Sequence, residues 1–342
     1  MKNLITRPIL LATMVTVSVL VAGCLERKET IRVARDGAVD FELTYTGDPG
    51  DFTSGDAMPE EAGGWTIKDE IKQTEQKKTE KERQARLRVD AGKPLPASFA
   101  TPGDRNRDTA LAFPTEVKVE QRADGTYYHF HRVYKARENV RYDYLNREMK
   151  EDEKLKEIAG KNAEELTPDE RGAMVAALRR VEGRKRAEYI ATALSEAHLR
   201  WPQDVGLRLR RGMIEHFDNA DVAPVVELLG ESSTDSRDAK INEYAQRLVD
   251  QSREKMHAVL EDSHAPAAEQ ATFFAAYEKA EAARAVTEDL GDEHWAIRVE
   301  LPGRIVEHNA DKLDEGAAVW EFPGEALMDR DVVLMATSRV ER

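Results

Sequence analysis

The only cysteine of this chain, Cys24, closes an uncharged apolar segment at the N-terminus. The segment has a positive start, an apolar middle and small side chains at its end (Lys2 and Arg7, residues 8–21, Ala22 and Gly23). This three-part pattern predicts an export signal, residues 1–23, that is removed from the mature protein. With one cysteine, the exported part forms no intramolecular disulfide, and a domain of this size can be stabilised by its core alone.

The segment Val21-Ala22-Gly23-Cys24 resembles the lipobox of bacterial lipoproteins. In that family the cysteine sulfur is diacylated and the cysteine becomes the first residue of the mature chain. The resemblance implies a lipid on Cys24 and an extracytoplasmic protein of the cell envelope that is attached to a membrane. Aspartate after the cysteine signals inner-membrane retention in many Gram-negative lipoproteins, so Leu25 favours the outer membrane, facing the periplasm, in such a source.

Two other interpretations of the N-terminus stay open. A transmembrane helix needs about 20 apolar residues, and the uncharged run from Pro8 to Leu25 is slightly shorter and begins with a proline. A plain secretory signal would leave Cys24 without a role. A lipid anchor needs no spanning helix, because each buried methylene contributes about 0.8 kcal/mol.

The predicted tether between Cys24 and the first strand is short. It consists of residues 25–30, and six extended residues reach at most about 20 Å. We therefore expect the folded part to lie close to the bilayer.

Composition limits the partners of the mature chain. Removal of residues 1–23 leaves 319 of the 342 residues, enough for one large domain or two modest ones. The net charge changes from −14 to about −16, because Lys2 and Arg7 are the charged residues removed. An acidic, evenly mixed surface lacks the clustered Lys and Arg of a nucleic-acid groove, so no nucleic-acid partner is predicted.

Alternating apolar residues predict a β-hairpin over residues 31–46. A three-residue loop, residues 35–37 with Gly37 in the left-handed conformation, pairs Ile31 with Phe41 and collects the apolar side chains on one face. A second hairpin is predicted over residues 113–136. There a two-residue turn at Asp124-Gly125 sets Val119 opposite Phe130 and Glu120 opposite His129.

No metal site is predicted from the acidic and histidine residues of these segments. His129 and His131 share a strand face, but no third ligand accompanies them, and a polar Glu120–His129 pair is the preferred interpretation. The acidic residues of the turn-rich stretch 47–66 do not have the spacing of an EF-hand (Asp48, Asp51 and Asp56).

Residues 67–90 are almost wholly polar, which predicts an exposed helix held by charge pairs or a flexible segment. From Asp143 to Leu290 the apolar period changes from two to about 3.6. Thr167 with Glu170 predicts a capping box that starts a long helix ending near Pro202. Further helices are predicted over 203–217, over 221–230, from Ile241 to Val259, and around Phe273 to Ala280.

Alternation returns near the C-terminus, in residues 294–301, 304–308, 317–322 and 332–340. Pro302-Gly303 predicts a type II turn between the first two. The predicted fold class is α+β, an antiparallel sheet formed by the N- and C-terminal segments with a large α-helical insertion. The predicted parts are the signal, the N-terminal β-rich half, the helical insertion and the C-terminal strands (1–23, 24–140, 141–290 and 291–342).

The run from Leu301 to Ala310, with Val319-Trp320 after it, resembles the end of LppM-type bacterial lipoprotein domains. Those domains also begin with a lipobox cysteine and a strand hairpin, as residues 31–45 do here. The resemblance implies a curved antiparallel sheet with helical cover and a lipid-binding role. The chain departs from that family through its helical insertion, and Glu307, His308 and Asn309 are interpreted as turn and strand-end residues.

The sequence contains no nucleophile elbow, phosphate loop, zinc-ligand helix or dinucleotide fingerprint. Cys24, as a lipidation site, is therefore the one site residue predicted, with no catalytic residue, metal ligand or cofactor. Three function classes stay open. They are a module that binds a lipid or other apolar ligand, an envelope scaffold whose helical insertion binds another protein, and a tethered hydrolase, which we rank below the other two.

Overall fold

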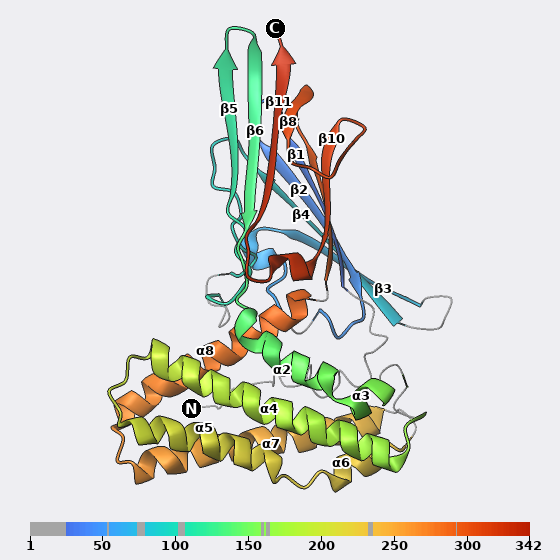
Figure 1. Ribbon diagram of the computed structural model, residues 1–342. Helices are drawn as coiled ribbons and strands as arrows, with labels where there is room; N and C mark the ends of the chain where they lie inside the picture. Colours follow the sequence, from blue (N-terminus) through green and yellow to red (C-terminus); the bar gives the residue numbers. More distant parts are fainter. Residues whose placement is uncertain are drawn as a thin grey trace. The chain divides into compact units, whose positions relative to one another are not determined.

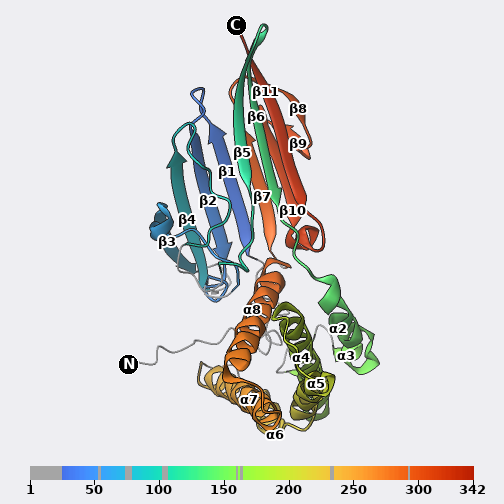
Figure 2. The ribbon, with the colours of Figure 1, turned by 90° about the vertical axis from the view of Figure 1, so that its left-hand side faces the viewer.

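The structure is a computed structural model that describes residues 25–52, 55–73, 79–101, 107–158, 161, 165–231, 235–291 and 293–342. Cys24 and the apolar segment before it lie outside these ranges. The chain divides into a sheet unit, residues 23–139 with 285–342, and a helical unit that contains residues 140–284. Figures 1 and 2 label the strands of the first and the helices of the second. The fold class is α+β, as predicted.

The sheet unit contains two sheets. The seven-stranded sheet has the order β3-β4-β2-β1-β7-β10-β9 and the four-stranded sheet the order β5-β6-β11-β8. The strands are β1 (Glu26–Val33), β2 (Val39–Gly47), β3 (Thr66–Gln73), β4 (Thr79–Val89), β5 (Thr115–Arg122), β6 (Gly125–Tyr134), β7 (His294–Glu300), β8 (Arg304–His308), β9 (Lys312–Asp314), β10 (Ala317–Pro323) and β11 (Val332–Glu341). Short 3-10 helices, η1 (Glu61–Gly63) and η3 (Gly324–Leu327), lie in the loops.

The N- and C-terminal segments build both sheets together, as predicted, because β1 pairs with β7 and β6 pairs with β11. The prediction of a single antiparallel sheet is wrong in two respects. The β1–β7 pair is parallel, and the turn at Pro302-Gly303 leads from β7 in one sheet to β8 in the other. Gly303 has a φ of +82°, and a Cβ there would lie 2.2 Å from the carbonyl oxygen of Arg339 on β11. The close approach of β11 at this turn requires glycine.

The first predicted hairpin is confirmed in position and register. Ile31 is paired with Phe41, and Gly37 closes the loop with a φ of +89°. The predicted register of the second hairpin is wrong by two residues, because Val119 lies opposite Tyr128 instead of Phe130.

The reason for the shifted register lies at Gly125. Gly125 is the first residue of β6 and has a φ of +153°. The loop before it consists of residues 123–124. A Cβ at Gly125 would come within 2.4 Å of the carbonyl oxygen of Val340, so the neighbouring strand β11 determines where the hairpin turns. A shift of two residues leaves each side chain on its predicted face.

Residues 66–73 and 79–89 form strands, so the predicted polar helix over 67–90 is wrong. Charge pairs hold this segment, but across strands rather than along a helix. Arg83 donates two hydrogen bonds of 2.8 Å to Asp69, and Lys72 donates one of 2.7 Å to Glu82. Opposite charges on neighbouring strands stabilise a hairpin that has few apolar side chains.

Strand β1 begins at Glu26, whereas the sequence predicts a strand from Ile31 and a tether over residues 25–30. The prediction of a six-residue tether is therefore wrong. The inward positions of the first half of β1 are Arg27 and Glu29, each 2% exposed. Charged residues at inward positions do not produce the apolar alternation by which a strand is identified.

Glu29 is the centre of a buried polar cluster that joins the two sheets. Nη1 of Arg132 on β6 donates a 2.6 Å hydrogen bond to one oxygen of Glu29, and the hydroxyl of Tyr134 donates a 3.2 Å bond to the other. Arg132 also donates from Nε to the hydroxyl of Thr115 on β5, at 2.7 Å. Burial raises the pKa of Tyr134 to about 12, so its hydroxyl keeps the proton that it donates.

Aromatic side chains fill the remaining space between the sheets. A continuous series of ring contacts with centroid distances of 4.6 to 6.2 Å runs through the core, along Phe41, Trp65, Phe99, Phe113, Tyr134 and Trp295. These rings come from both sheets and from the connecting segments, and they make one hydrophobic core.

The helical unit contains the five predicted helices and two more, before residue 167, that were not predicted individually. They are α2 (Val140–Glu151), α3 (Glu153–Ile158), α4 (Pro168–Glu196), α5 (Gln203–Asp218), α6 (Ala223–Leu228), α7 (Asp235–Asp262) and α8 (Ala267–Gly291), of which the last residues, from Ala285, belong to the sheet unit. The capping box of Thr167 and Glu170 is confirmed. None of the described helices has the length and apolar character of a membrane span.

A change of Glu29 to Gln tests the buried cluster. Removing one charge of a buried pair leaves the other uncompensated, so we expect the free energy of unfolding to fall by about 3–5 kcal/mol. Urea unfolding followed by tryptophan fluorescence measures this, because three of the four tryptophans lie in the sheet core.

The control for this experiment is Glu42→Gln, which removes a partly exposed partner of Arg32 and Arg86 and should cost less than about 1 kcal/mol. The double change Glu29→Leu with Arg132→Met should recover most of the loss. Equal effects of Glu29→Gln and Glu42→Gln would contradict the structural role of the cluster.

Candidate functional site

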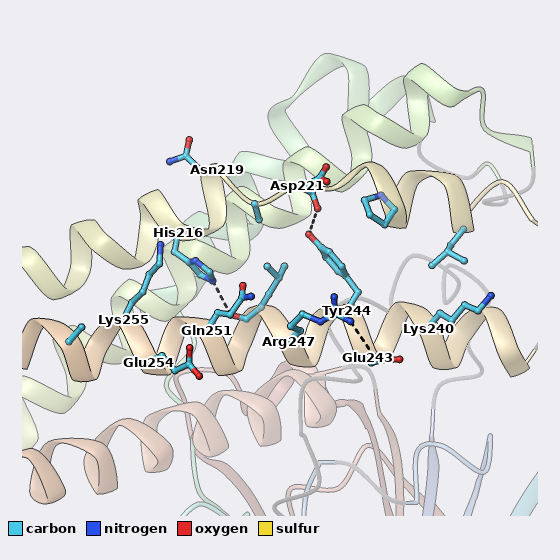
Figure 3. Close-up of a pocket in the computed structure, with 15 residues that line it drawn as sticks. His216, Asn219, Asp221, Lys240, Glu243, Tyr244, Arg247, Gln251, Glu254 and Lys255 are labelled. Atoms are coloured by element: carbon cyan, nitrogen blue, oxygen red, sulfur yellow. Dashed lines mark hydrogen bonds and ion pairs between the residues drawn. The ribbon is translucent and has the colours of Figure 1, made fainter.

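A groove with a volume of about 890 Å³ lies in the helical unit. Figure 3 shows its lining side chains, which come from α7 on one side and from α5, α6 and the connection between them on the other. The second side contributes His216, Asn219, Ala220, Asp221, Pro224 and Leu228.

Helix α7 presents one continuous face to this groove. The lining residues follow one another at spacings of three or four along the helix, with one adjacent pair at each of three turns (Lys240, Glu243, Tyr244, Arg247, Leu248, Gln251, Glu254, Lys255 and Ala258). From Lys240 to Ala258 this face is about 27 Å long, at 1.5 Å per residue. Most of its side chains are polar, whereas a helix face packed in a core is apolar.

Two hydrogen bonds cross the groove and connect its sides. Nε2 of His216 on α5 lies 2.9 Å from the carbonyl oxygen of Leu248 on α7. The hydroxyl of Tyr244 on α7 donates to the carbonyl oxygen of Asp221. Figure 3 shows both side chains reaching across. The two bonds fix the separation of α7 from the α5–α6 connection, so the groove is a built feature of the unit.

The surroundings of His216 favour its neutral form. The residue is 7% exposed, and this burial lowers its pKa. The nearby cations Lys255 and Arg186 lower the pKa further, while the bond to Leu248 opposes the shift. Because a carbonyl oxygen accepts only, Nε2 carries the proton in this bond.

The charges of the groove are mixed. Arg247 and Glu243 form an ion pair of 3.2 Å within α7, and a carboxylate oxygen of Asp221 accepts the backbone N–H of Ala223. Lys240, Glu254 and Lys255 make no ion pair with any other described residue. These three side chains and the amides of Asn219 and Gln251 offer hydrogen-bond donors and acceptors to a polar ligand along the groove.

The structure places the histidines considered in the sequence on the outer face of the four-stranded sheet. Nε2 of His129 lies 3.4 Å from a carboxylate oxygen of Glu120, which confirms the predicted pair, and Nδ1 lies 3.1 Å from the hydroxyl of Thr337. His131 is exposed two residues further along β6. Within the described ranges, no group of three acidic, histidine or cysteine side chains is arranged to hold a metal ion.

The C-terminal residues Glu307, His308 and Asn309 lie at a strand end, as predicted, because β8 ends at His308. Asn309 donates from its amide to the carbonyl of Val333 and accepts from the indole of Trp320. Its side chain is thus used within the fold. Cys24 lies outside the described residues.

The groove residues were not identified from the sequence. The sequence predicts the helix from Ile241 to Val259 that carries most of them, but it assigns the polar side chains of that helix no role. The composition of that helix was the sequence feature that could have indicated the groove. Polar side chains recur at helical spacing between Lys240 and Ala258, on the same helix as the buried Leu248 and Leu260.

Comparisons with known proteins do not assign the chain to a family. No family model matches the sequence, and no curated protein matches it. A solved structure, the folded domain of LppM from Mycobacterium tuberculosis, aligns over 100% of this chain and 96% of its own length, with 6% sequence identity and a TM-score of 0.29. A TM-score of this size does not establish a shared fold, so the predicted resemblance to LppM-type domains stays a prediction.

The lowered pKa of His216 makes the helical unit sensitive to acid. In the unfolded chain a histidine takes up a proton near pH 6.5, whereas the folded chain resists protonation of His216. The unfolded state therefore binds more protons as the pH falls, and stability is lost from about pH 6.5 downward. We expect the urea midpoint of the wild type, followed by helical circular dichroism, to fall relative to His216→Gln between about pH 7.5 and about pH 5.5.

The matched control is His257→Gln, an exposed position on α7. Its urea midpoint should follow that of the wild type over this pH range. A constant difference between wild type and His216→Gln at all pH values would contradict the assignment.

Proposed function

We propose that this chain is a lipid-anchored protein of the cell envelope whose helical unit binds a segment of another envelope protein along α7. The groove of Figure 3 carries the proposal. It is an open surface about 27 Å long, and its width is held by the bonds of His216 and Tyr244.

The chemistry of the groove favours a polypeptide over an apolar ligand. An acyl chain placed against Asn219, Gln251 and Lys255 would remove water from these groups without replacing their hydrogen bonds, which is costly. A polypeptide backbone supplies both donors and acceptors. About eight residues of extended chain, at roughly 3.3 Å each, match the length of the α7 face. The filled aromatic core of the sheet unit also gives the apolar-ligand alternative no support.

The lipid anchor is proposed at Cys24, and its support is the segment Val21-Ala22-Gly23-Cys24 after an apolar stretch. The protein would be extracytoplasmic and, in a Gram-negative source, would face the periplasm from the outer membrane. In this arrangement the anchor determines where the protein acts and the groove determines what it binds.

Site-specific photocrosslinking in cells tests the groove. A photoreactive amino acid at Gln251 should produce one discrete protein adduct, because this exposed side chain lines the groove. The matched control is the neighbouring Asp250, which is exposed on α7 but does not line the groove and should give little adduct. Ala258→Arg, which adds bulk to the groove wall, should reduce the Gln251 adduct several-fold.

Equal adducts at both positions would contradict the proposal, and a lipid that copurifies with an uncrosslinked protein would favour the apolar-ligand alternative.

Metabolic labelling tests the anchor. Wild-type protein should incorporate an alkyne analogue of palmitate and lose residues 1–23, whereas Cys24→Ser should incorporate none, because no other cysteine exists. The Cys24→Ser protein should also leave the membrane fraction if it is exported and cleaved by another route. Labelling of Cys24→Ser, or a wild-type mass that includes residues 1–23, would show that the anchor is not a lipid on this sulfur.

A further inference from the structure

Leu25, the residue after Cys24, is fixed in the sheet unit. It is 4% exposed, and its carbonyl oxygen accepts a 3.0 Å hydrogen bond from the backbone N–H of His294. Its Cδ1 lies 3.0 Å from the position of a Cβ at Gly47, so the glycine allows close packing there. The chain is thus held in place one residue after the proposed lipid.

Leu25 lies at the end of the central strand of the seven-stranded sheet. Strand β1 begins at the next residue and lies between β2 and β7. Its first residue, Glu26, pairs with Thr46 at the end of β2 and with His294 at the start of β7. The end of β10 lies at the same edge, because Pro323 pairs with His294.

The chain length between the lipid and the sheet leaves no slack. Adjacent Cα atoms are about 3.8 Å apart across a trans peptide bond, so Cys24 lies within that distance of a buried residue. Acyl chains on its sulfur must lie in the hydrocarbon of the bilayer. The sheet end that contains Leu25 must then lie at the bilayer surface, whatever the direction of the peptide between Leu25 and Cys24.

We infer that the end of the seven-stranded sheet at Leu25, Thr46 and His294 is a membrane-apposed surface, and that the opposite end, at Val33 and Glu300, is directed away from the bilayer. This inference rests on the proposed lipid on Cys24 and adds the orientation of the protein. It replaces a tether of six residues by a direct contact between the folded unit and the lipid headgroups.

The side chains at this end indicate which lipid surface they fit. Glu26, Asp48 and Asp51 contribute negative charge near Leu25, and the side chain of Glu26 pairs with Lys28. Lys81 lies opposite Gly47 on β4 and adds a positive charge at the same end. The charges are therefore mixed, without the cluster of Lys and Arg that anionic lipid attracts. The acyl chains therefore supply the membrane affinity.

Fluorescence quenching in vesicles tests the orientation. The two variants are His294→Cys and Glu300→Cys. Both positions lie on the outward face of β7 and are separated by about 20 Å at 3.3 Å per residue. Because Cys24 is acylated, the introduced cysteine is the only free thiol and takes a bimane label. Full-length lipidated protein is placed in phosphatidylcholine vesicles that contain a lipid with a headgroup nitroxide.

We expect the label at position 294 to be quenched several-fold more strongly than the label at position 300. A flexible Gly-Ser linker of about 20 residues between Cys24 and Leu25 should abolish this difference while acylation and vesicle binding persist. Equal quenching at both positions in protein without the linker would overturn the inference. Mass spectrometry of each protein before the measurement separates this outcome from a missing lipid, which would instead overturn the proposed anchor and, with it, the orientation.

Discussion

The residue at which β1 begins depends on the groups that pair with the buried carboxylate of Glu29, which lies between the two sheets. Burying an isolated carboxylate costs several kcal/mol. Arg132 and Tyr134, on a strand more than 100 residues later in the chain, supply a cation and a hydroxyl to its two oxygens. Without them the inward positions of residues 26–30 could not be buried, and β1 would begin near Ile31. The same contacts connect the seven-stranded sheet to the four-stranded sheet.

Arg27 completes the charged half of β1 and aligns it with β7. Its guanidinium carbon lies 3.9 Å from the ring centroid of Trp295, which is its partner in the parallel β1–β7 register. The rings of Tyr45, Phe99 and Phe113 lie within 6 Å of the same group. Cation–π contacts of this kind stabilise a desolvated guanidinium, and Nη2 lies 3.9 Å from Glu29. A shift of β1 along β7 by one residue would move Arg27 to the outer face, so these contacts favour a single register.

The sequence predicts elements well where their inward positions are apolar. The first hairpin is identified in position and register because Ile31 and Phe41 fall on one face. The capping box at Thr167 is identified because its residues are neighbours in sequence. The charged half of β1 and the β3–β4 hairpin are missed for one physical reason. Their stabilising partners, Arg132 for Glu29 and Arg83 for Asp69, are visible only after the strands are paired.

Long-range backbone contacts account for the remaining differences. The register of the second hairpin and the division into two sheets depend on how closely β11 approaches Gly125 and Gly303. A glycine in the sequence marks a tight position, but it does not say which strand lies against it. The groove is missed for a related reason. A polar helix face has the same pattern whether it is exposed to solvent or lines a groove, and the bonds of His216 and Tyr244 to distant carbonyls distinguish the two.

The proposed anchor limits which proteins the proposed groove can bind. A long flexible tether would let a binding unit search the envelope for partners at a distance from the membrane. With a lipid on Cys24, as proposed, and Leu25 buried at the next residue, the protein would diffuse in the plane of its membrane. A partner of the groove would then have to come to this membrane. A protein in the same membrane meets this requirement at high effective concentration, because two molecules confined to one surface meet more often than two in solution. The proposed anchor would therefore make a membrane-associated protein a better partner for the groove than a freely diffusing one.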